Sequence, residues 1–297
     1  MSNRIVASVI TDSGLCIFVD DQQYVVPSNH PNILKIKEAL KNRQYDQIVE
    51  LVNVRKAVAQ YLGKDRSFVL KNDLIHLNDR PFSDAVTDKV LSMLEAGNDA
   101  EPLFAFLRNV RLNPSKTAQD ELLLFCVANG FMITEDGYIL AYKSLNDEYK
   151  DIHSGTVLNK PGHLMTETER RSLPQTVNGV TTTTAFDGKK DITIVSISRG
   201  QVDDNREKTC SVGLHFAAFG YASTWAGDRI KHIVVMKIHP RDVVSIPNDY
   251  DNQKGRCCRY QVVSEIKCGK ALPKQEVYSK AVCSCGDPTC NYDFNNA

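Results

Sequence analysis

Three predicted strands of this sequence carry polar or ionisable side chains among their apolar residues. They are 138–145 (YILAYKSL), 213–217 (GLHFA) and 257–263 (CCRYQVV). A set of lysine, histidine and arginine presents positive charge and hydrogen-bond donors, which suits a phosphate or a nucleotide. The candidate ligand-binding residues are Tyr142, Lys143, His215, Arg259 and Tyr260. The simpler alternative for His215 is a core histidine with a satisfied hydrogen bond, and we prefer it.

The cysteines offer a second kind of chemistry. The chain has nine of them, and the four toward its end could supply thiolates to a structural zinc ion. These four are Cys268, Cys283, Cys285 and Cys290. Their C-x-C-x4-C spacing differs from the common C-x2-C pattern, so a tail with free thiols is an equal alternative. Cys257 and Cys258 are adjacent in a predicted strand and therefore point to opposite faces, which makes a shared site difficult.

Composition indicates a soluble globular protein without strong attraction to nucleic acid. Apolar residues make up 42% of the 297 residues, and 36 basic residues balance 36 acidic ones. A net charge of zero argues against a strongly basic nucleic-acid binder, although a local patch stays open. No apolar run approaches the roughly 20 residues that span a bilayer, and the N-terminus lacks a secretory signal. We therefore expect a cytoplasmic protein.

The elements that must position these residues fall into two halves of an α+β fold. A small β unit is predicted at 1–27, and a mostly helical region at 28–130 with a β-hairpin near 66–80. Within that region Ser83 is expected to cap one helix. Asn113 is expected to cap another, with Pro114 at the first helical position and Gly130 at the end.

The second half is predicted to be rich in β-structure. A domain at 131–267 opens with a strand, an Asp-Gly turn and a strand, and contains a long loop at 146–190. Residues 248–254 are polar and are expected to form a turn. Residues 268–297 are the cysteine-rich tail.

Several longer motifs resemble a known family. They are VNVRKAVAQYL, the Asn113–Ser115 segment, VANGFMITEDGYILAYKSL, CSVGLHF, HPRDVVSIPNDY and CRYQVV. In this order they resemble the rIIB proteins of tailed bacteriophages, from about the N-terminal β unit to about Ile266. The resemblance implies an early phage protein without enzymatic activity, acting with a partner, the rIIA protein, which is similar to Hsp90-like ATPases.

What the resemblance implies about function is a phenotype more than a mechanism. The pair is expected to protect infection against exclusion by a resident prophage or the host and to affect the timing of lysis. The expected location is the host cytoplasm, with peripheral association at the inner face of the membrane. No catalytic residue is carried over from the family.

Two departures from the family pattern matter. The chain starts directly at its β unit, so DNA contact through a helix-turn-helix segment is not expected to transfer. The cysteine-rich tail is not part of the pattern.

A second resemblance concerns GLHFAAFGYAS and the apolar strand IVVMKI that follows it. The rhythm is similar to a segment of ADP-ribosyltransferases, so the β-rich half is expected to resemble a degenerate form of that fold. There a carboxylate stabilises the oxocarbenium-like transition state. Here Arg259 or Tyr260 stands where that glutamate is expected, and Glu265 lies at the other end of the strand. The alternative function is therefore a nucleotide- or NAD-binding protein or a weak transferase.

Overall fold

The structure is a computed structural model of the whole chain. It describes residues 5–11, 14–19, 22–28, 30, 32–52, 67–95, 100–158, 160–186, 191–208, 210–248 and 253–266. The chain forms two compact units, Met1–Ala100 and Glu101–Ala297. Both contain helices and strands, which confirms the predicted α+β class. This division lies near residue 100, and the predicted boundary near residue 130 stays a prediction.

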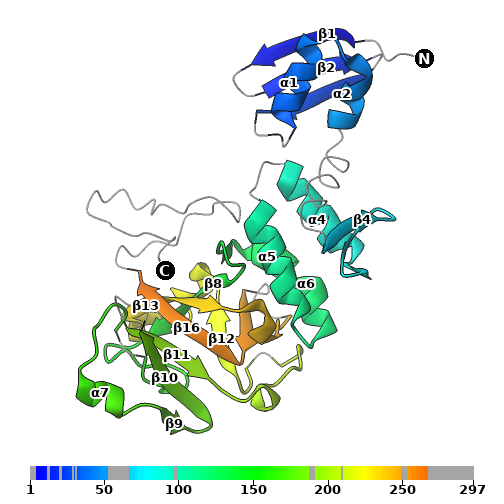
Figure 1. Cartoon of the computed structure of the whole chain (residues 1–297). Coiled ribbons are helices and arrows are strands. Elements are labelled where there is room, and N and C mark those ends of the chain that lie inside the picture. Colours follow the sequence, from blue (N-terminus) through cyan, green and yellow to red (C-terminus); the bar gives the residue numbers. More distant parts are fainter. Residues whose placement is uncertain are drawn as a thin grey trace. The chain divides into compact units, whose positions relative to one another are not determined.

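A three-stranded antiparallel sheet opens the first unit. Its strands are β1 (Ile5–Thr11), β2 (Gly14–Val19) and β3 (Gln22–Pro27), in that order. Alternate residues of β2, Leu15, Ile17 and Val19, are buried beneath two helices. These helices are α1 (Ile33–Lys41) and α2 (Tyr45–Val52), and Figure 1 shows them lying along the sheet.

A second small sheet follows in the same unit. It consists of β4 (Phe68–Lys71), β5 (Leu74–Leu77) and β6 (Arg80–Pro81). The two-residue loop Asn72–Asp73 has positive φ at both positions, 51° and 59°, as a type I′ turn requires. Helix α4 (Asp84–Glu95) begins after Ser83, whose Oγ accepts a hydrogen bond from Val86 N at 3.4 Å.

Two helices begin the second unit, α5 (Ala100–Arg111) and α6 (Lys116–Asn129). The predicted cap at Asn113 is wrong, because α6 is capped by Ser115, whose Oγ accepts from Ala118 N. The Asn113 side chain is instead drawn to the sheet, where Nδ2 donates to Pro240 O at 2.8 Å and Val243 O at 2.7 Å. Gly130 ends the helix in the left-handed region, at φ 65°.

The body of the second unit is a ten-stranded antiparallel sheet. Its order is β14-β15-β12-β8-β13-β16-β11-β10-β9, with β7 paired to β8. Figure 1 labels the strands from β8 to β13 and β16. The bounds are β7 Met132–Ile133, β8 Ile139–Leu145, β9 Gln175–Val177, β10 Val180–Phe186, β11 Asp191–Ser196, β12 Leu214–Ala217, β13 His232–Ile238, β14 Val243–Ser245, β15 Lys254–Cys257 and β16 Arg259–Glu265. Strand β8 lies between β12 and β13, and all seven of its residues are buried.

Short helices connect these strands. Helix α7 (Glu167–Arg171) starts with a capping box formed by Thr166 and Glu169. Helix α8 (Phe219–Ala222) follows β12 and packs on β8. Three 3-10 turns lie at Arg199–Gln201, Gly227–Arg229 and Pro240–Asp242. In the part of the chain that the structure describes, no helix is long and apolar enough to cross a membrane.

Two segments differ from the sequence-based expectation. The predicted loop at 146–190 contains α7 and the strands β9 and β10. Strand β10 has the sequence VTTTTAF. Threonine is β-branched and therefore favours strands, but it gives no apolar pattern from which this strand could be predicted.

The second correction concerns Cys257 and Cys258, which do not share a strand. Cys257 ends β15, a strand that starts at Lys254 within the predicted turn, and Cys258 lies in the bend before β16. Gly255 lets β15 approach the ring of Phe216, because a Cβ there would lie 2.4 Å from the ring atom Cζ. Contact with a distant segment therefore determines that residues 254–257 form a strand, which their composition does not predict.

Candidate ligand-binding site

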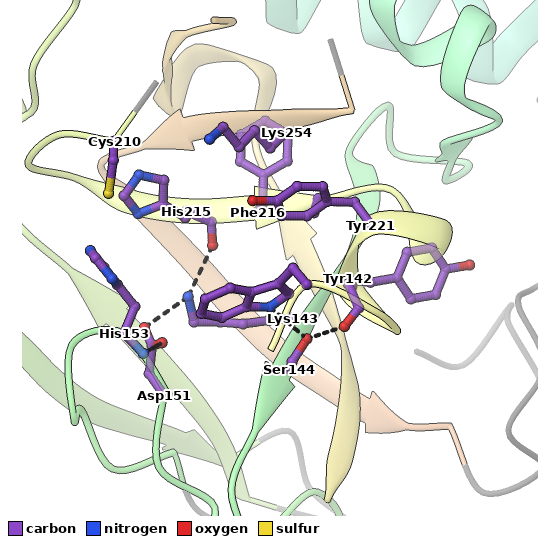
Figure 2. Close-up of a pocket in the computed structure, with 13 residues that line it drawn as sticks. Tyr142, Lys143, Ser144, Asp151, His153, Cys210, His215, Phe216, Tyr221 and Lys254 are labelled. Carbon is purple, nitrogen blue, oxygen red and sulfur yellow. Dashed lines mark hydrogen bonds and ion pairs between the residues drawn. The ribbon is translucent and has the colours of Figure 1, made fainter. Parts of the chain in front are cut away.

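Polar and aromatic side chains from β8, β12, β15 and the α8 region surround a hollow in the second unit. Its volume is about 90 Å³, which is room for several water molecules. Figure 2 shows Cys210, His215, His153 and Asp151 gathered on one side of it and Tyr221 on the other. The hollow therefore has a polar side and an aromatic side.

A buried ion pair forms the centre of the polar side. Lys143 Nζ lies 2.8 Å from Asp151 Oδ2, and the two side chains are only 7% and 8% exposed. Lys143 also donates to the backbone oxygen of His215 at 3.0 Å. Asp151 accepts two further hydrogen bonds, from His153 N and Ser154 Oγ. Burial raises the pKa of the Asp151 carboxyl, but the Lys143 charge and the donated hydrogen bonds outweigh burial and lower it to about 2.

His215 borders the hollow from β12. Its ring meets the ring of His153 edge-on, with centroids 5.3 Å apart. Burial lowers the pKa of His215 to about 3, and the nearby charges of Lys143, His153 and Arg256 act in the same direction. Within the described residues its ring nitrogens have no hydrogen-bond partner. The structure places His215 at the wall of the hollow, and the expectation of a core histidine with a satisfied hydrogen bond stays a prediction.

The aromatic side is held in place by hydrogen bonds and a lysine. Trp225 Nε1 donates to Ser144 Oγ at 3.2 Å, and Ser144 Oγ donates in turn to the backbone oxygen of Ala222. Lys254 Nζ lies over the Tyr221 ring, 5.7 Å from its centroid. The orientation of the indole is thus fixed by β8, while 39% of Trp225 stays exposed.

Buried Arg256 shapes the loop that leads to the hollow. Its side chain is fully buried, and its donors are satisfied by oxygens of neighbouring residues. The acceptors are Asp203 O, Lys208 O, Asn205 O and Ser245 Oγ, at 2.7 to 3.0 Å. Because this loop runs directly toward Cys210, the guanidinium helps to place an exposed free thiol at the rim.

The structure brings together three of the five candidate residues. Tyr142, Lys143 and His215 line the hollow. Tyr260 is fully buried beneath it, with Lys143 Nζ 5.9 Å from its ring centroid, and burial raises the pKa of its phenol. Arg259 is exposed and pairs with Ser196 of β11, and it is not among the residues that line the hollow. Strand alternation is the cause, because Arg259 and Tyr260 are adjacent in β16 and point to opposite faces.

Sequence reasoning missed other lining residues, among them Asp151, Cys210, Trp225 and Lys254. Asp151 and Lys254 lie in segments predicted to be loop or turn. Trp225 carried a usable signal, since it is the one tryptophan of the chain and ends the small-residue segment 217–225.

A second cluster of ionisable groups lies where β13 begins and β16 ends. His232 Nδ1 and Glu265 Oε1 are 2.7 Å apart, and Tyr149 donates its hydroxyl to Glu265 Oε2 at 2.9 Å. The rings of Tyr149 and His232 are stacked at 4.0 Å. Burial and the Glu265 carboxylate raise the pKa of Tyr149 to about 12. Both carboxylate oxygens of Glu265 are therefore engaged within the cluster.

No cluster that could hold a metal ion occurs among the described residues. The four cysteines of the predicted zinc site, Cys268, Cys283, Cys285 and Cys290, lie outside these residues. Zinc binding by the tail stays a prediction.

Comparisons with known proteins agree on one family. The family model for bacteriophage T4 protein rIIB matches residues 176–277, which include His215, Trp225 and Lys254. Protein rIIB of Enterobacteria phage T4 is 32% identical over 253 residues, which is 85% of this chain and 70% of that protein. No solved structure matches the chain, so the resemblance to ADP-ribosyltransferases stays a prediction. The chain belongs to the bacteriophage rIIB family.

Proposed function

We propose that this chain is a phage accessory protein that protects infection against exclusion by a resident prophage or the host and affects the timing of lysis. It acts without catalysing a reaction, in a complex with an rIIA-like ATPase, in the host cytoplasm or at the inner face of the membrane. The observation that carries the proposal is the 32% identity to T4 protein rIIB over 253 residues.

The chemistry of the second unit supports a role without catalysis. The carboxylate at the hollow, Asp151, is held by Lys143 and two further donors. Glu265 is held by His232 and Tyr149. A carboxylate engaged in this way is a poor nucleophile or general base, because ionic and hydrogen-bonded partners stabilise its resting form.

The proposal is tested in the phage that encodes this chain. Deleting its gene should abolish plaques on a host that carries an excluding prophage, and the chain supplied from a plasmid should restore them. A Gly137→Val chain is the control for lost folding, because Gly137 has φ +73° and a Cβ there would lie 2.3 Å from Phe106 N.

The partner is tested separately by affinity purification. A tagged chain isolated from infected cells should retain the rIIA protein of the same phage, and the Gly137→Val chain should not. Plaques that form without this gene on the excluding host, or failure to retain rIIA, would contradict the proposal.

A second candidate function is binding of a nucleotide or NAD. What favours it is that Tyr142, Lys143 and His215 line one hollow together with Lys254 and Trp225. Thermal unfolding of the intact chain with and without millimolar NAD tests it. Bound NAD should raise the midpoint of unfolding clearly. A midpoint that NAD leaves unchanged would count against this candidate and against a weak transferase built on the same site.

A further inference from the structure

The charged groups at the hollow are already engaged within the chain. Lys143 Nζ pairs with Asp151 Oδ2 at 2.8 Å, and Asp151 is the one carboxylate among the described residues of the lining. Lys254 is engaged as well, with its ammonium over the Tyr221 ring at 5.7 Å. A charged ligand would lose hydration at this wall without gaining a free partner of opposite charge. A neutral ligand is therefore the better complement of the hollow.

Aromatic rings supply flat apolar surface to the hollow. Trp225 and Tyr221 lie in its lining, beside the buried side chains of Tyr142 and Phe216. The indole is fixed through its hydrogen bond to Ser144, so stacking a planar ring on it costs little side-chain entropy. Any flat ring can stack on an aromatic side chain, because every such ring has a π-face. The ligand is therefore expected to be planar.

The size of the hollow limits the ligand to one ring. An enclosed apolar cavity of roughly 150 Å³ holds a benzene molecule. The hollow is smaller, at about 90 Å³, but it opens to solvent, since Cys210 and Trp225 in its lining are exposed. One six-membered ring can thus lie partly inside, whereas a second fused ring would stay outside.

His215 offers a hydrogen-bonding group to such a ring. Among the described residues its ring nitrogens have no partner, and its ring contact is the edge-on ring of His153 at 5.3 Å. A neutral imidazole has one donor and one acceptor nitrogen. A ring edge that carries carbonyl and N–H groups can meet either of them. Figure 2 shows the imidazole on the polar side of the hollow, beside Cys210.

We propose that the hollow binds one neutral, planar six-membered nitrogen ring with a carbonyl and N–H edge, as the pyrimidine bases have. The ring stacks on Trp225, its polar edge meets His215, and the rest of a nucleoside or nucleotide stays outside. A pyridine ring with a carboxamide shares this chemistry, and the test separates the two sources. The inference rests on the second candidate function above, ligand binding in this hollow, and is independent of the complex with rIIA.

Saturation-transfer NMR on the intact chain measures the binding of four probes. Thymine should bind saturably, with a dissociation constant of about 1 mM or below. Isoorotate has the same ring with a carboxylate in place of the methyl group, and should bind about tenfold more weakly because its charge loses hydration. Adenine has a second fused ring and should bind more weakly than thymine. Nicotinamide represents the other source, and whichever neutral ring binds more tightly identifies the source.

The variant His215→Phe keeps a flat ring and removes the ring nitrogens. It should weaken the binding of thymine about fivefold and leave the binding of benzene, which has no polar edge, unchanged. His239→Phe is the matched control, because His239 also meets an aromatic ring edge-on, that of Tyr138 at 4.8 Å, and is not among the lining residues. This control should bind both probes as the unchanged chain does, and circular dichroism checks that both variants fold.

Two measurements on the unchanged chain locate the bound probe without any substitution. Thymine should quench the emission of Trp225, the one tryptophan in the sequence. It should also slow the alkylation of Cys210, followed on its own peptide by mass spectrometry. Cys126 and Cys257 are buried and serve as unreactive references. A probe that binds with neither effect lies elsewhere, and the inference is then wrong.

Four further outcomes would overturn the inference: no saturable binding of thymine or nicotinamide, isoorotate binding as tightly as thymine, adenine binding more tightly than thymine, or His215→Phe binding thymine as His239→Phe does. If NAD binds while both neutral rings fail, the inference fails and the second candidate function stands. If a neutral ring binds and NAD does not, the inference stands and the candidate fails for the whole dinucleotide. If all of them fail to bind, both are wrong. Plaque rescue tests the accessory function in each case.

Discussion

The hollow and the His232–Glu265 cluster use the same types of residue in opposite ways. At the hollow, the carboxylate of Asp151 pairs with a lysine and the imidazole of His215 is left neutral beside open space. In the cluster, the carboxylate of Glu265 sits between an imidazole and a phenol, and both of its oxygens are engaged. The first arrangement leaves hydrogen-bonding capacity for a ligand, whereas the second uses it up.

One segment joins the two sites. Tyr149 belongs to the cluster, and Asp151 and His153, two and four residues later, belong to the hollow. The bridge between Leu145 and Asp151 closes this segment against the end of β8. The cluster therefore acts as the anchor of the segment that forms one wall of the hollow.

The largest effect should follow from removing the charge of Asp151. Asp151→Asn leaves the buried ammonium of Lys143 without its counter-charge and should lower the free energy of unfolding by about 3 kcal/mol or more. Urea denaturation followed by circular dichroism measures the loss.

The double variant Lys143→Met/Asp151→Asn is the control for that experiment. It removes both charges and should recover a large part of the lost stability. A loss below about 1 kcal/mol in the single variant would show that this pair behaves like a surface pair, as in the more exposed cluster.

Acid should remove the contribution that the Asp151 carboxylate makes to the free energy of unfolding. The pKa of Asp151 is lowered from 3.8 to about 2, so its contribution is fully present above about pH 4 and is lost as the pH falls through about 2. The size of this contribution is roughly 2 kcal/mol.

Denaturation curves at a series of pH values between neutrality and pH 2 measure this dependence. The difference in stability between the unchanged chain and Asp151→Asn should shrink across the acid end of the series. A difference that stays constant down to pH 2 would mean that folding does not lower the pKa of Asp151.

A smaller effect is expected at the cluster. Glu265→Gln keeps the shape of the side chain and removes its charge, and the partners His232 and Glu265 are 24% and 15% exposed. The free energy of unfolding should fall by about 1 kcal/mol, because water can replace part of the interaction. If Glu265→Gln destabilised the chain more than Asp151→Asn, the contrast between a buried pair and a partly hydrated one would be wrong.

Much of the fold follows from local chemistry in the sequence. The Asn72–Asp73 and Asp136–Gly137 turns define hairpins, and Ser83 and Gly130 mark helix ends. Prediction failed where contacts between distant segments decide. β15 has the sequence KGRC and is a strand because it pairs with β12. The Asn113 side chain does not cap the helix and donates to carbonyls of the 240–243 segment.

The site divides in the same way. Lys143 and His215 stand out because they interrupt apolar strands, and both do line the hollow. Their neighbours are set by strand order and register, which sequence spacing does not encode. Lys254 reaches the hollow because it pairs with Ala217 across β12 and β15, and Arg259 points to the opposite face of β16 from its neighbour Tyr260.

The smallest effect should follow from removing the hydrogen bonds through which Ser144 orients the indole of Trp225. Ser144→Ala removes the acceptor of the Trp225 indole and the donor to Ala222 O, and should lower stability by about 0.5 to 1 kcal/mol. The emission of Trp225 should shift to longer wavelength, because the freed indole gains contact with water, while the Glu265→Gln chain should keep its emission unchanged. An unchanged spectrum in Ser144→Ala would mean that packing alone orients Trp225, and the hollow would then resemble the self-contained cluster more closely than its hydrogen bonds indicate.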